Sequence, residues 1–261
     1  MLPDVRPDTL ESNYQPLTTY LSEELQQEVQ LVIPEDYADL VRMFGTAEVD
    51  IANFGGATFV SAEEKYQAVP LVMRDIDTRF TSYFLARFDA KEGRVSDFEG
   101  QALGFGSRLS TSGHYMPRYF LQEQAIDPDT FFSDVLYSGA HDKTVGLLLD
   151  GQVDLAAVNS EVVDSMLRQG QLDAKSLRIV WETPVYADYV WAIQPGWNEL
   201  YANKVRDAFL RLSLSDERDA EILQNLGAGG FLPATTGDFF RLRAIVLQKS
   251  GAVDKIENQA D

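Results

Sequence analysis

The sequence predicts an α/β protein divided into two lobes, and three observations carry this prediction. Apolar strands alternate with longer helical stretches, which is typical of α/β units with mostly parallel sheets. The alternation runs through two cycles, of which the second begins near Val95 and the first resumes after the stretch YADYVWAIQPG. At 261 residues, the chain is also large for one hydrophobic core. We therefore expect lobe 1 at residues 1–87 and 190–261, lobe 2 at 88–189, and a ligand cleft between them.

The first cycle is predicted from its apolar spacing. Tyr14, Leu17, Leu21 and Leu25 recur at helical spacing and predict a helix over residues 10–25. An α/β unit normally begins with a strand, yet only two residues precede the first turn, so we expect that strand to be missing or very short. The other elements expected in this cycle are a strand at 29–34, a helix at 36–44, a buried strand within 49–54 that runs into a Gly-Gly turn and a helix, and strands at 68–75 and 81–88.

The second cycle repeats the pattern. Its expected elements are strands at 101–107, 134–139, 153–159 and 177–184 and helices at 113–122, 142–152 and 160–170. The tail has an amphipathic helix at 198–213 and two further helical segments.

The composition excludes several classes of site. The chain has no cysteine, which removes thiol catalysis, cysteine zinc sites and disulfides. The two histidines, His114 and His141, argue against a multi-histidine metal centre, and we expect neither a metal nor a cofactor. The net charge of −19 argues against binding to nucleic acid or to anionic membrane surfaces. The sequence contains no apolar run of about 18 residues, the length that spans a bilayer.

A cluster of hydroxyl residues opens the helix of the second cycle. Ser110, Thr111, Ser112 and Gly113 follow a strand at the point where a helix begins. The first N–H groups of a helix lack partners and its dipole is positive there, so an oxyanion suits both, and the hydroxyls donate further hydrogen bonds. The alternative is an ordinary Ser/Thr helix cap, followed by Pro117 in the first turns.

Two other segments end strands on the expected cleft side. In SGAHDKTVG, His141 is positioned to donate into the cleft, or else it is a partly buried histidine bonded to a backbone carbonyl. His114 has a weaker claim and is expected to face solvent. In ANFGGATF, Gly55 and Gly56 allow a tight turn whose N–H groups face the other lobe, while Phe54 is either a cleft wall or core.

The crossing segments supply the last candidates. Tyr186, Asp188 and Tyr189 lie in TPVYADYVW, where the chain returns between the lobes, and Asp188 is either a pocket residue or a hinge carboxylate on the surface. Tyr83, in the other crossing segment TSYFLARF, is either core or pocket lining.

The sequence does not predict an enzyme. Ser112, His141 and an aspartate form a catalytic triad only on paper, because no G-x-S-x-G elbow is present and the serine lies among other hydroxyls. The zinc-protease, P-loop and EF-hand patterns do not occur either.

In combination, these segments resemble the periplasmic substrate-binding proteins of phosphonate- and phosphite-type ABC transporters, the PhnD-like family. The resemblance runs from YQPLTTYLSEEL through DIANFGGATFV, STSG and SGAHDKT to VWETPVYADYVW, which is nearly the whole chain. The pair STSG and SGAHDK, in this order and spacing, carries most of it. The segment WETPVYADYVW is similar to the branch that includes phosphite binders and proteins described as selenate binders.

The resemblance implies a class II periplasmic-binding-protein fold, with two α/β lobes joined by two crossing strands and a cleft that closes on its ligand. It also implies that the STSG turn grips the anion, that His141 donates a hydrogen bond, and that Tyr83 and Asp188 contact the ligand from the two crossings. The expected ligand-binding residues are Ser110, Thr111, Ser112, Gly113, His141, Tyr83, Asp188, Gly56, Phe54 and Tyr189.

The family implies a monomer that hands its ligand to an ABC permease in the inner membrane. The expected location is periplasmic or extracytoplasmic, although the printed sequence shows no signal segment. Two alternatives stay open: a sensor module that feeds a histidine kinase, and an enzyme on the same scaffold.

Asp188 decides which anion we expect. A buried carboxylate repels a fully ionised sulfate or selenate, whereas an anion that still carries a proton can donate it through a P–OH group. Phosphite or a small alkyl phosphonate therefore ranks first, phosphate or arsenate second, and selenate or sulfate last. We expect the lobes to close by hinge motion near residues 83–90 and 186–192.

Overall fold

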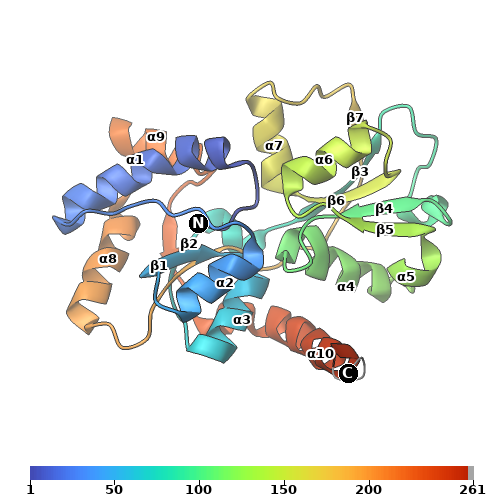
Figure 1. The fold of residues 1–261 in the computed structure, drawn as a ribbon. Helices are drawn as coiled ribbons and strands as arrows, with labels where there is room; N and C mark the ends of the chain where they lie inside the picture. Colours follow the sequence, from blue (N-terminus) through green and yellow to red (C-terminus); the bar gives the residue numbers. More distant parts are fainter. Residues whose placement is uncertain (258–261) are drawn as a thin grey trace.

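The computed structural model describes residues 1–257 and shows two lobes side by side, each built on one β-sheet with helices on both faces (Figure 1). The lobe 1 sheet has the strand order β1-β8-β2-β9, and the lobe 2 sheet has the order β5-β4-β6-β3-β7. The two-lobe α/β architecture predicted from the alternation of strands and helices is confirmed.

Lobe 1 packs helices on both faces of its sheet. The helices α1, α8 and α9 enclose one apolar cluster around Leu17, Trp191 and Phe209, while α2, α3 and α10 enclose the other around Phe44 and Phe59. The strands are β1 (Ile51–Phe54), β2 (Val69–Arg74), β8 (Val190–Ile193) and β9 (Phe231–Pro233). The helices are α1 (Pro7–Leu25), α2 (Tyr37–Gly45), α3 (Gly56–Tyr66), α8 (Glu199–Arg211), α9 (Glu217–Asn225) and α10 (Phe240–Glu257), with the short helix η4 at Thr236–Phe239.

Lobe 2 has the same layered plan. Phe84, Phe105 and Leu121 lie in the cluster on one face of its sheet, and Leu85 and Val145 in the cluster on the other. The strands are β3 (Ser82–Arg87), β4 (Ala102–Phe105), β5 (Asp134–Tyr137), β6 (Leu155–Asn159) and β7 (Leu177–Glu182). The helices are α4 (Met116–Glu123), α5 (Pro128–Phe131), α6 (His141–Leu149) and α7 (Ser160–Arg168), with short helices η2 (Val95–Phe98) and η3 (Thr111–Tyr115).

The chain crosses between the lobes where two extended segments meet. Phe80 and Tyr186 exchange backbone hydrogen bonds, at 2.8 Å from the Phe80 N–H and 3.0 Å from the Tyr186 N–H. The first crossing follows the short helix η1 (Asp75–Arg79) and enters β3, which pairs with β6 and β7 in lobe 2. The residues of β3, which we had expected in lobe 1, therefore belong to the lobe 2 sheet.

The lobe 1 sheet is antiparallel throughout and the lobe 2 sheet is mixed, so the expectation of mostly parallel sheets is wrong. The strand β8 runs antiparallel to β1 and β2, and β3 runs antiparallel to β6 and β7. These are the two strands beside the crossings, and a chain that returns between lobes enters each sheet in the opposite direction. The pairs β4–β5 and β4–β6 are parallel, as expected for α/β units.

Residues 29–34, expected as a strand, are assigned neither strand nor helix. Alternating apolar residues form a strand only when a neighbouring strand supplies hydrogen bonds, and β1 pairs on one side with β8 alone. The strand β9 was not expected, because its three residues are too few to show a periodicity.

In residues 1–257, none of the helices is both long and apolar enough to cross a bilayer.

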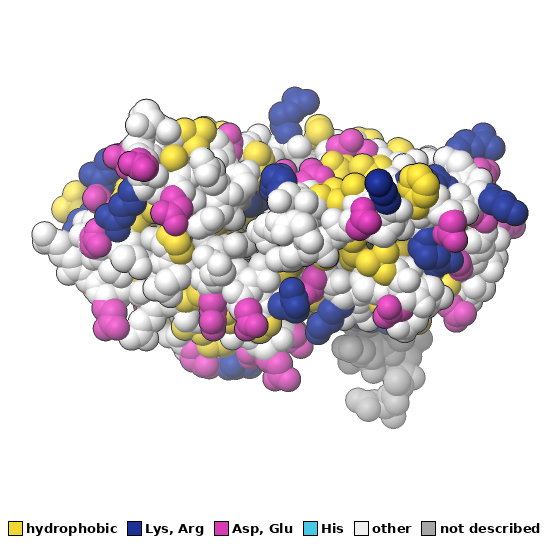
Figure 2. Space-filling view, turned by 90° about the horizontal axis from the view of Figure 1, so that it is seen from above, with side chains coloured by type: hydrophobic (Ala, Val, Ile, Leu, Met, Phe, Trp, Pro, Cys, Tyr) yellow, Lys and Arg dark blue, Asp and Glu magenta, His cyan; other side chains and the backbone are white. Residues whose placement is uncertain are grey.

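The surface reflects the acidic composition. On the face shown in Figure 2, acidic and basic side chains are interspersed over both lobes, and no continuous basic surface covers the elements in view. This distribution gives nucleic acid no basic tract on that face.

Candidate functional site

Two helix starts meet between the lobes. Ser110 caps the lobe 2 helix by accepting the N–H of Gly113 at 2.9 Å. The turn that follows, Thr111–Tyr115, is wound as a π-helix rather than a regular α-helix. From this turn, Thr111 Oγ1 accepts the N–H of Ala57 at 2.9 Å, in the first turn of α3 in lobe 1. The hydroxyl cluster therefore caps its own helix and also contacts the start of a helix in the other lobe.

Asp188 lies at the same helix start. Its Oδ1 accepts the Gly56 N–H at 3.0 Å, and the residue is 1% exposed. Its Oδ2 is buried and has no hydrogen-bond partner among the described residues. Burial raises the pKa of Asp188 to about 7, and the Gly56 N–H bond and the nearby Thr111 and Ser112 hydroxyls oppose this effect. The carboxyl can therefore hold or release a proton near neutral pH.

His141 is fully buried beside the hydroxyl turn. Burial lowers its pKa to about 3, so the ring is neutral at physiological pH. Its Nδ1 faces the Asn159 N–H at 3.4 Å, which makes Nδ1 the acceptor and leaves the proton on Nε2. Nε2 lies 3.5 Å from Ser110 Oγ. His141 is thus a neutral hydrogen-bond donor whose Nε2–H faces the hydroxyl turn. Its ring accepts the backbone N–H of Asn159 and is not bonded to a backbone carbonyl, which was the alternative expected from the sequence.

Gly113 is required by this packing. A Cβ at Gly113 would lie 2.8 Å from His141 Cε1 and 3.0 Å from Ser110 Oγ, closer than atoms in contact normally approach. The absence of a side chain therefore allows the imidazole and the turn to touch.

A chain of polar groups joins the two lobes beside this cluster. The Asn159 amide at the end of β6 donates to the Tyr189 hydroxyl at 2.8 Å, and that hydroxyl donates to Asp4 Oδ2 at 2.7 Å. The His141 N–H also donates to the Asp4 carbonyl at 2.9 Å. Tyr189 and Asp4 belong to lobe 1 and Asn159 and His141 to lobe 2, so these bonds hold the cleft closed.

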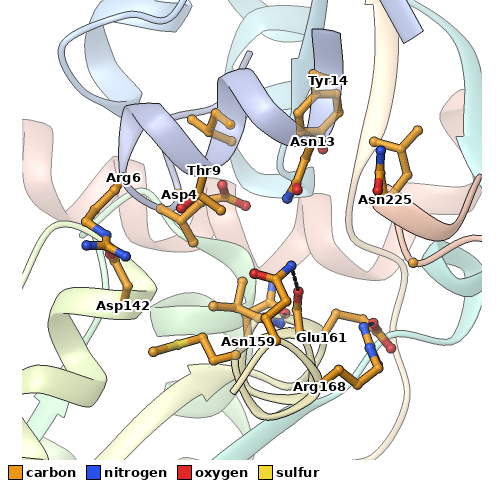
Figure 3. Close-up of a pocket in the computed structure, with 18 of the residues that line it drawn as sticks. Asp4, Arg6, Thr9, Asn13, Tyr14, Asp142, Asn159, Glu161, Arg168 and Asn225 are labelled. Atoms are coloured by element: carbon orange, nitrogen blue, oxygen red, sulfur yellow. Dashed lines mark hydrogen bonds and ion pairs between the residues drawn. The ribbon is translucent and has the colours of Figure 1, made fainter. Parts of the chain in front are cut away.

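Figure 3 shows the outer part of this cleft, a pocket of about 90 Å³. The side chains of Asp4 and Arg6 reach it from lobe 1, and those of Asn159 and Glu161 reach it from lobe 2. Arg6 and Asp142 form an ion pair across the cleft at 3.5 Å. The inner cluster is sealed, since Ser110, Thr111 and Ser112 are each no more than 2% exposed. A ligand reaches these hydroxyls only when the lobes separate.

The structure brings most of the predicted residues together, but not all of them. Ser110, Thr111, Ser112, Gly113, His141, Gly56 and Asp188 form the cluster, and Tyr189 adjoins it.

Tyr83 lies elsewhere: its hydroxyl donates to Asp164 Oδ2 on α7 at 3.3 Å. Phe54 is fully buried against Phe44 in the lobe 1 core, with ring centroids 5.2 Å apart, so its core reading is the correct one.

His114 does not face solvent as expected. It is 8% exposed, and Nδ1 lies 2.7 Å from the Arg108 carbonyl. The triad of Ser112 with His141 is not formed either, because Ser110 rather than Ser112 is the serine beside the imidazole.

Besides Asp4 and Asn159, the sequence prediction missed Ser82 and Tyr37. Ser82, beside Tyr83 in β3, donates to the Ser112 carbonyl at 2.7 Å and lies 2.5 Å from the Tyr186 hydroxyl. Successive side chains of a strand point to opposite faces, so Ser82 faces the site while Tyr83, the residue predicted to do so, faces away from it. Tyr37, in the first turn of α2, has a buried hydroxyl near that of Ser110; burial raises the pKa of Tyr37 well above its usual value, and Ser110 opposes this effect. In the sequence, it is indistinguishable from an aromatic core residue.

A metal centre has no obvious ligand set here. Among the side chains that the structure describes, those of residues 1–248, no group of three or more His, Asp or Glu is arranged to hold a metal ion.

The chain is similar to known proteins over most of its length. A family model described as "ABC transporter, phosphonate, periplasmic substrate-binding protein" matches residues 1–239. The "Probable ABC transporter phosphite binding protein PhnD1" of Prochlorococcus marinus is 28% identical over 256 residues, covering 94% of this chain and 86% of the relative. The "Phosphate-import protein PhnD" of Mycolicibacterium smegmatis is 26% identical over 265 residues, covering 94% of this chain and 83% of the relative.

The fold has a matching solved structure. The structure of PhnD1 from Prochlorococcus marinus in complex with methylphosphonate superposes with a TM-score of 0.90, at 26% identity, covering 95% of this chain and 96% of that one.

Proposed function

Because the chain belongs to the family of phosphonate periplasmic substrate-binding proteins of ABC transporters, we propose that it captures a small tetrahedral oxyanion that carries a proton. Phosphite or a small alkyl phosphonate is the first choice, and phosphate or arsenate the second. The observation that carries this choice is Asp188, a buried carboxyl at a helix start with one oxygen unpartnered.

Asp188 lies at the helix start where an anion would also bind, and the two negative groups are compatible there only if they share a proton. The start of α3 attracts anions, and Asp188 already holds the Gly56 N–H there. A second, fully ionised anion in the same dry space would be repelled by the carboxylate. An anion with a P–OH group can instead donate to the free Oδ2, which makes a strong charge-assisted hydrogen bond. Sulfate and selenate carry no proton at neutral pH and are disfavoured.

The other groups supply donors without adding charge. The neutral His141 offers Nε2–H, and the hydroxyls of the STSG turn offer further hydrogen bonds. Backbone N–H groups at Gly56 and Ala57 add the field of the helix start. A binding site of this kind needs no lysine or arginine, which suits an anion bound inside a protein of net charge −19.

The relatives support the ligand class and leave the choice within it open. Their names specify phosphite and phosphate, and the superposed structure holds methylphosphonate. All three are small phosphorus oxyanions that can carry a P–OH group. The preference among them therefore rests on the proton-accepting site rather than on the names.

Membership of this family implies an extracytoplasmic location and a partnership with an ABC permease, and the family is one of binding proteins rather than enzymes. The burial of the inner cluster supports a cycle in which the lobes open and close about the Phe80–Tyr186 bridge. A monomeric state and the alternative of a sensor module for a histidine kinase remain predictions.

Thermal unfolding against a panel of anions tests the proposal. A ligand at about a thousand times its dissociation constant adds roughly 4 kcal/mol to the free energy of unfolding. We expect large shifts with phosphite or methylphosphonate, a smaller one with phosphate or arsenate, and none with sulfate or selenate. A shift with sulfate or selenate alone would show that binding does not depend on a proton shared between the anion and Asp188. No shift with any anion would show that STSG is only a helix cap.

A further inference from the structure

A chain of hydroxyl groups runs from the second crossing segment to the STSG turn. The Ser82 hydroxyl donates to the Ser112 carbonyl at 2.7 Å, and the Tyr186 hydroxyl lies 2.5 Å from Ser82 Oγ. The single hydroxyl proton of Ser82 is committed to Ser112, because a carbonyl can only accept. Tyr186 is therefore the donor to Ser82, and the chain runs in one direction, from Tyr186 through Ser82 to the Ser112 carbonyl.

This hydroxyl chain lies in the interior of the protein. Ser82, Ser112 and Tyr186 are all buried. Burial raises the pKa of Tyr186 well above its usual value, so the hydroxyl keeps the proton that it donates. The Tyr186 ring packs against Phe80 of the first crossing and Phe120 of α4, with ring centroids 6.2 and 6.3 Å away. Buried hydrogen bonds in series polarise one another, so the bond to Ser112 depends on the bond from Tyr186.

Backbone pairing fixes the start of the hydroxyl chain. The Ser82 N–H donates to Thr183 Oγ1 at 2.9 Å, and the Thr183 N–H donates to the Ser82 carbonyl at 3.0 Å. Phe80 and Tyr186 exchange backbone hydrogen bonds beside them. The two crossing segments are thus paired here, which holds Ser82 and Tyr186 relative to each other where the chain passes between the lobes.

The far end of the hydroxyl chain fixes one peptide group of the STSG turn. The Ser112 carbonyl and the Gly113 N–H belong to the same planar peptide. The carbonyl accepts from Ser82, while the N–H donates to Ser110 Oγ at 2.9 Å. A peptide held at both of its polar atoms has a fixed orientation, and it sets the direction of the Ser112 side chain. The Ser112 hydroxyl lies near Asp188, the carboxyl assigned to the proton of the ligand.

We propose that Ser82 and Tyr186 are positioning residues for the anion. Through the hydroxyl chain, they hold the Ser112 hydroxyl and the first N–H groups of the STSG turn in the orientation that binds the ligand. This inference rests on the proposed function, since it requires that the anion binds at this turn. It gives the Tyr186 hydroxyl a role beyond the packing of its ring, and it connects the crossing segments to the geometry of the site.

A double-mutant cycle tests the hydroxyl chain. Titration calorimetry with phosphite at pH 7 compares Ser82→Ala, Tyr186→Phe and the double variant. Ser82→Ala removes the bond to the Ser112 carbonyl and should weaken binding about 10-fold, whereas Tyr186→Phe leaves that bond in place and should weaken binding about 3-fold. The double variant should bind no more weakly than Ser82→Ala, because Tyr186 acts only through Ser82. Two independent effects would instead multiply to about 30-fold.

The matched control for the tyrosine is Tyr20→Phe. The Tyr20 hydroxyl is also buried and donates to the Ala208 carbonyl at 2.8 Å, within lobe 1 and away from the STSG turn. Tyr20→Phe and Tyr186→Phe should both lower the free energy of unfolding, since each removes a buried hydrogen bond. Only Tyr186→Phe should weaken phosphite binding.

The carbon-13 NMR signal of the Ser112 carbonyl gives a readout that a merely structural role would not move. Ser82→Ala should shift this signal. Tyr186→Phe should shift it in the same direction by a smaller amount, although its hydroxyl bonds to Ser82 and not to the carbonyl. Tyr20→Phe should leave it unchanged.

The outcomes separate this inference from the proposed function. If the wild type binds phosphite and Ser82→Ala binds it equally well, the inference is wrong and the proposed function stands. A multiplicative loss in the double variant, or a Ser112 signal that Tyr186→Phe does not shift, would also overturn the inference alone. A wild type that does not bind phosphite would overturn the proposed function and this inference with it.

Discussion

Asp188 and Gly56 are 132 residues apart in the chain, and the Asp188 carboxylate accepts the Gly56 N–H at 3.0 Å. This bond places a carboxyl at a helix start, where a bound anion also belongs. The two negative groups are compatible only if they share a proton, and the free Oδ2 is the atom that receives it. The identity of the ligand therefore depends on the protonation chemistry of one residue.

Replacing Asp188 with Asn tests this dependence. The amide keeps an oxygen for the Gly56 N–H but cannot accept a proton as a charged group. Loss of a charge-assisted hydrogen bond is expected to weaken phosphite binding about 10- to 100-fold, while sulfate binding improves because the repulsion disappears. Titration calorimetry at pH 7, near the pKa of Asp188, measures both. Asp164→Asn, at a carboxylate bonded to Tyr83 outside the cluster, is the matched control and should bind phosphite as the wild type does. Unchanged phosphite affinity in Asp188→Asn would refute the role.

The same residue predicts a pH dependence of stability in the absence of ligand. The pKa of Asp188 is about 7 in the folded chain against 3.8 in the unfolded chain. Between these values only the folded state holds the proton, so the free energy of unfolding falls as pH rises from about 4 to 7 and then levels off. The Asp188→Asn variant lacks this loss and should gain up to about 4 kcal/mol relative to the wild type across that range. Denaturant unfolding at pH 4 to 8 measures the difference, and parallel stability curves would contradict it.

His141 makes a separate spectroscopic prediction. Its burial keeps the ring neutral, and the backbone N–H of Asn159 selects the tautomer with the proton on Nε2. Nitrogen-15 NMR spectra should therefore show the Nε2–H tautomer without protonation between pH 5 and 8. Protonation of His141 within this range would mean that the site adds a positive charge for the anion, contrary to the neutral-donor reading.

The sequence predicted the parts of the site that depend on local pattern. The STSG turn and SGAHDK both place donors at a helix start after a strand, and the structure finds Ser110 and His141 together. The parts of the fold that depend on contacts between residues far apart in the sequence could not be predicted. Residues 29–34 have the alternation of a strand, but no alternation shows whether a neighbouring strand exists.

Two errors have a common physical origin. Ser82 rather than Tyr83 faces the site, and a one-residue difference in a strand exchanges its faces. Tyr37 lies at the start of α2 with its hydroxyl near that of Ser110, although from the sequence a buried tyrosine at a helix start is predicted to be a core residue. In both cases a correct prediction requires knowing which side of the strand or helix faces the cleft, and the packing of the lobes determines that side.

Gly113→Ala should disrupt binding by a steric route. The added methyl group would lie 2.8 Å from His141 Cε1, so either the imidazole or the hydroxyl turn must move. We expect phosphite affinity to fall at least tenfold, since displacement of about 1 Å is costly in a closed anion site. The control is Gly146→Ala on α6, where a Cβ meets no atom within 4 Å among the described residues. That change should leave affinity unaltered and raise helix stability slightly. Equal affinities in the two variants would show that the Gly113–His141 contact is not part of the binding site.

The last prediction concerns closure of the lobes. The Tyr189 hydroxyl links Asn159 of lobe 2 to Asp4 of lobe 1, so Tyr189→Phe leaves the buried Asn159 side chain and the partly buried Asp4 carboxylate without their shared partner. An unsatisfied buried group costs about 1–3 kcal/mol, and this cost falls on the closed form, where the groups are buried. Phosphite affinity should therefore fall roughly 10-fold, and small-angle scattering at subsaturating phosphite should show a larger mean radius of gyration.

Tyr83→Phe is the matched control for this change. It also removes one tyrosine hydroxyl, but that hydroxyl bonds to Asp164 within lobe 2 and does not link the lobes. Affinity and radius of gyration should match the wild type. If Tyr83→Phe weakens binding as much as Tyr189→Phe does, the ligand contact predicted for Tyr83 from the sequence is real, and the hydroxyl of Tyr189 has no special role in closure.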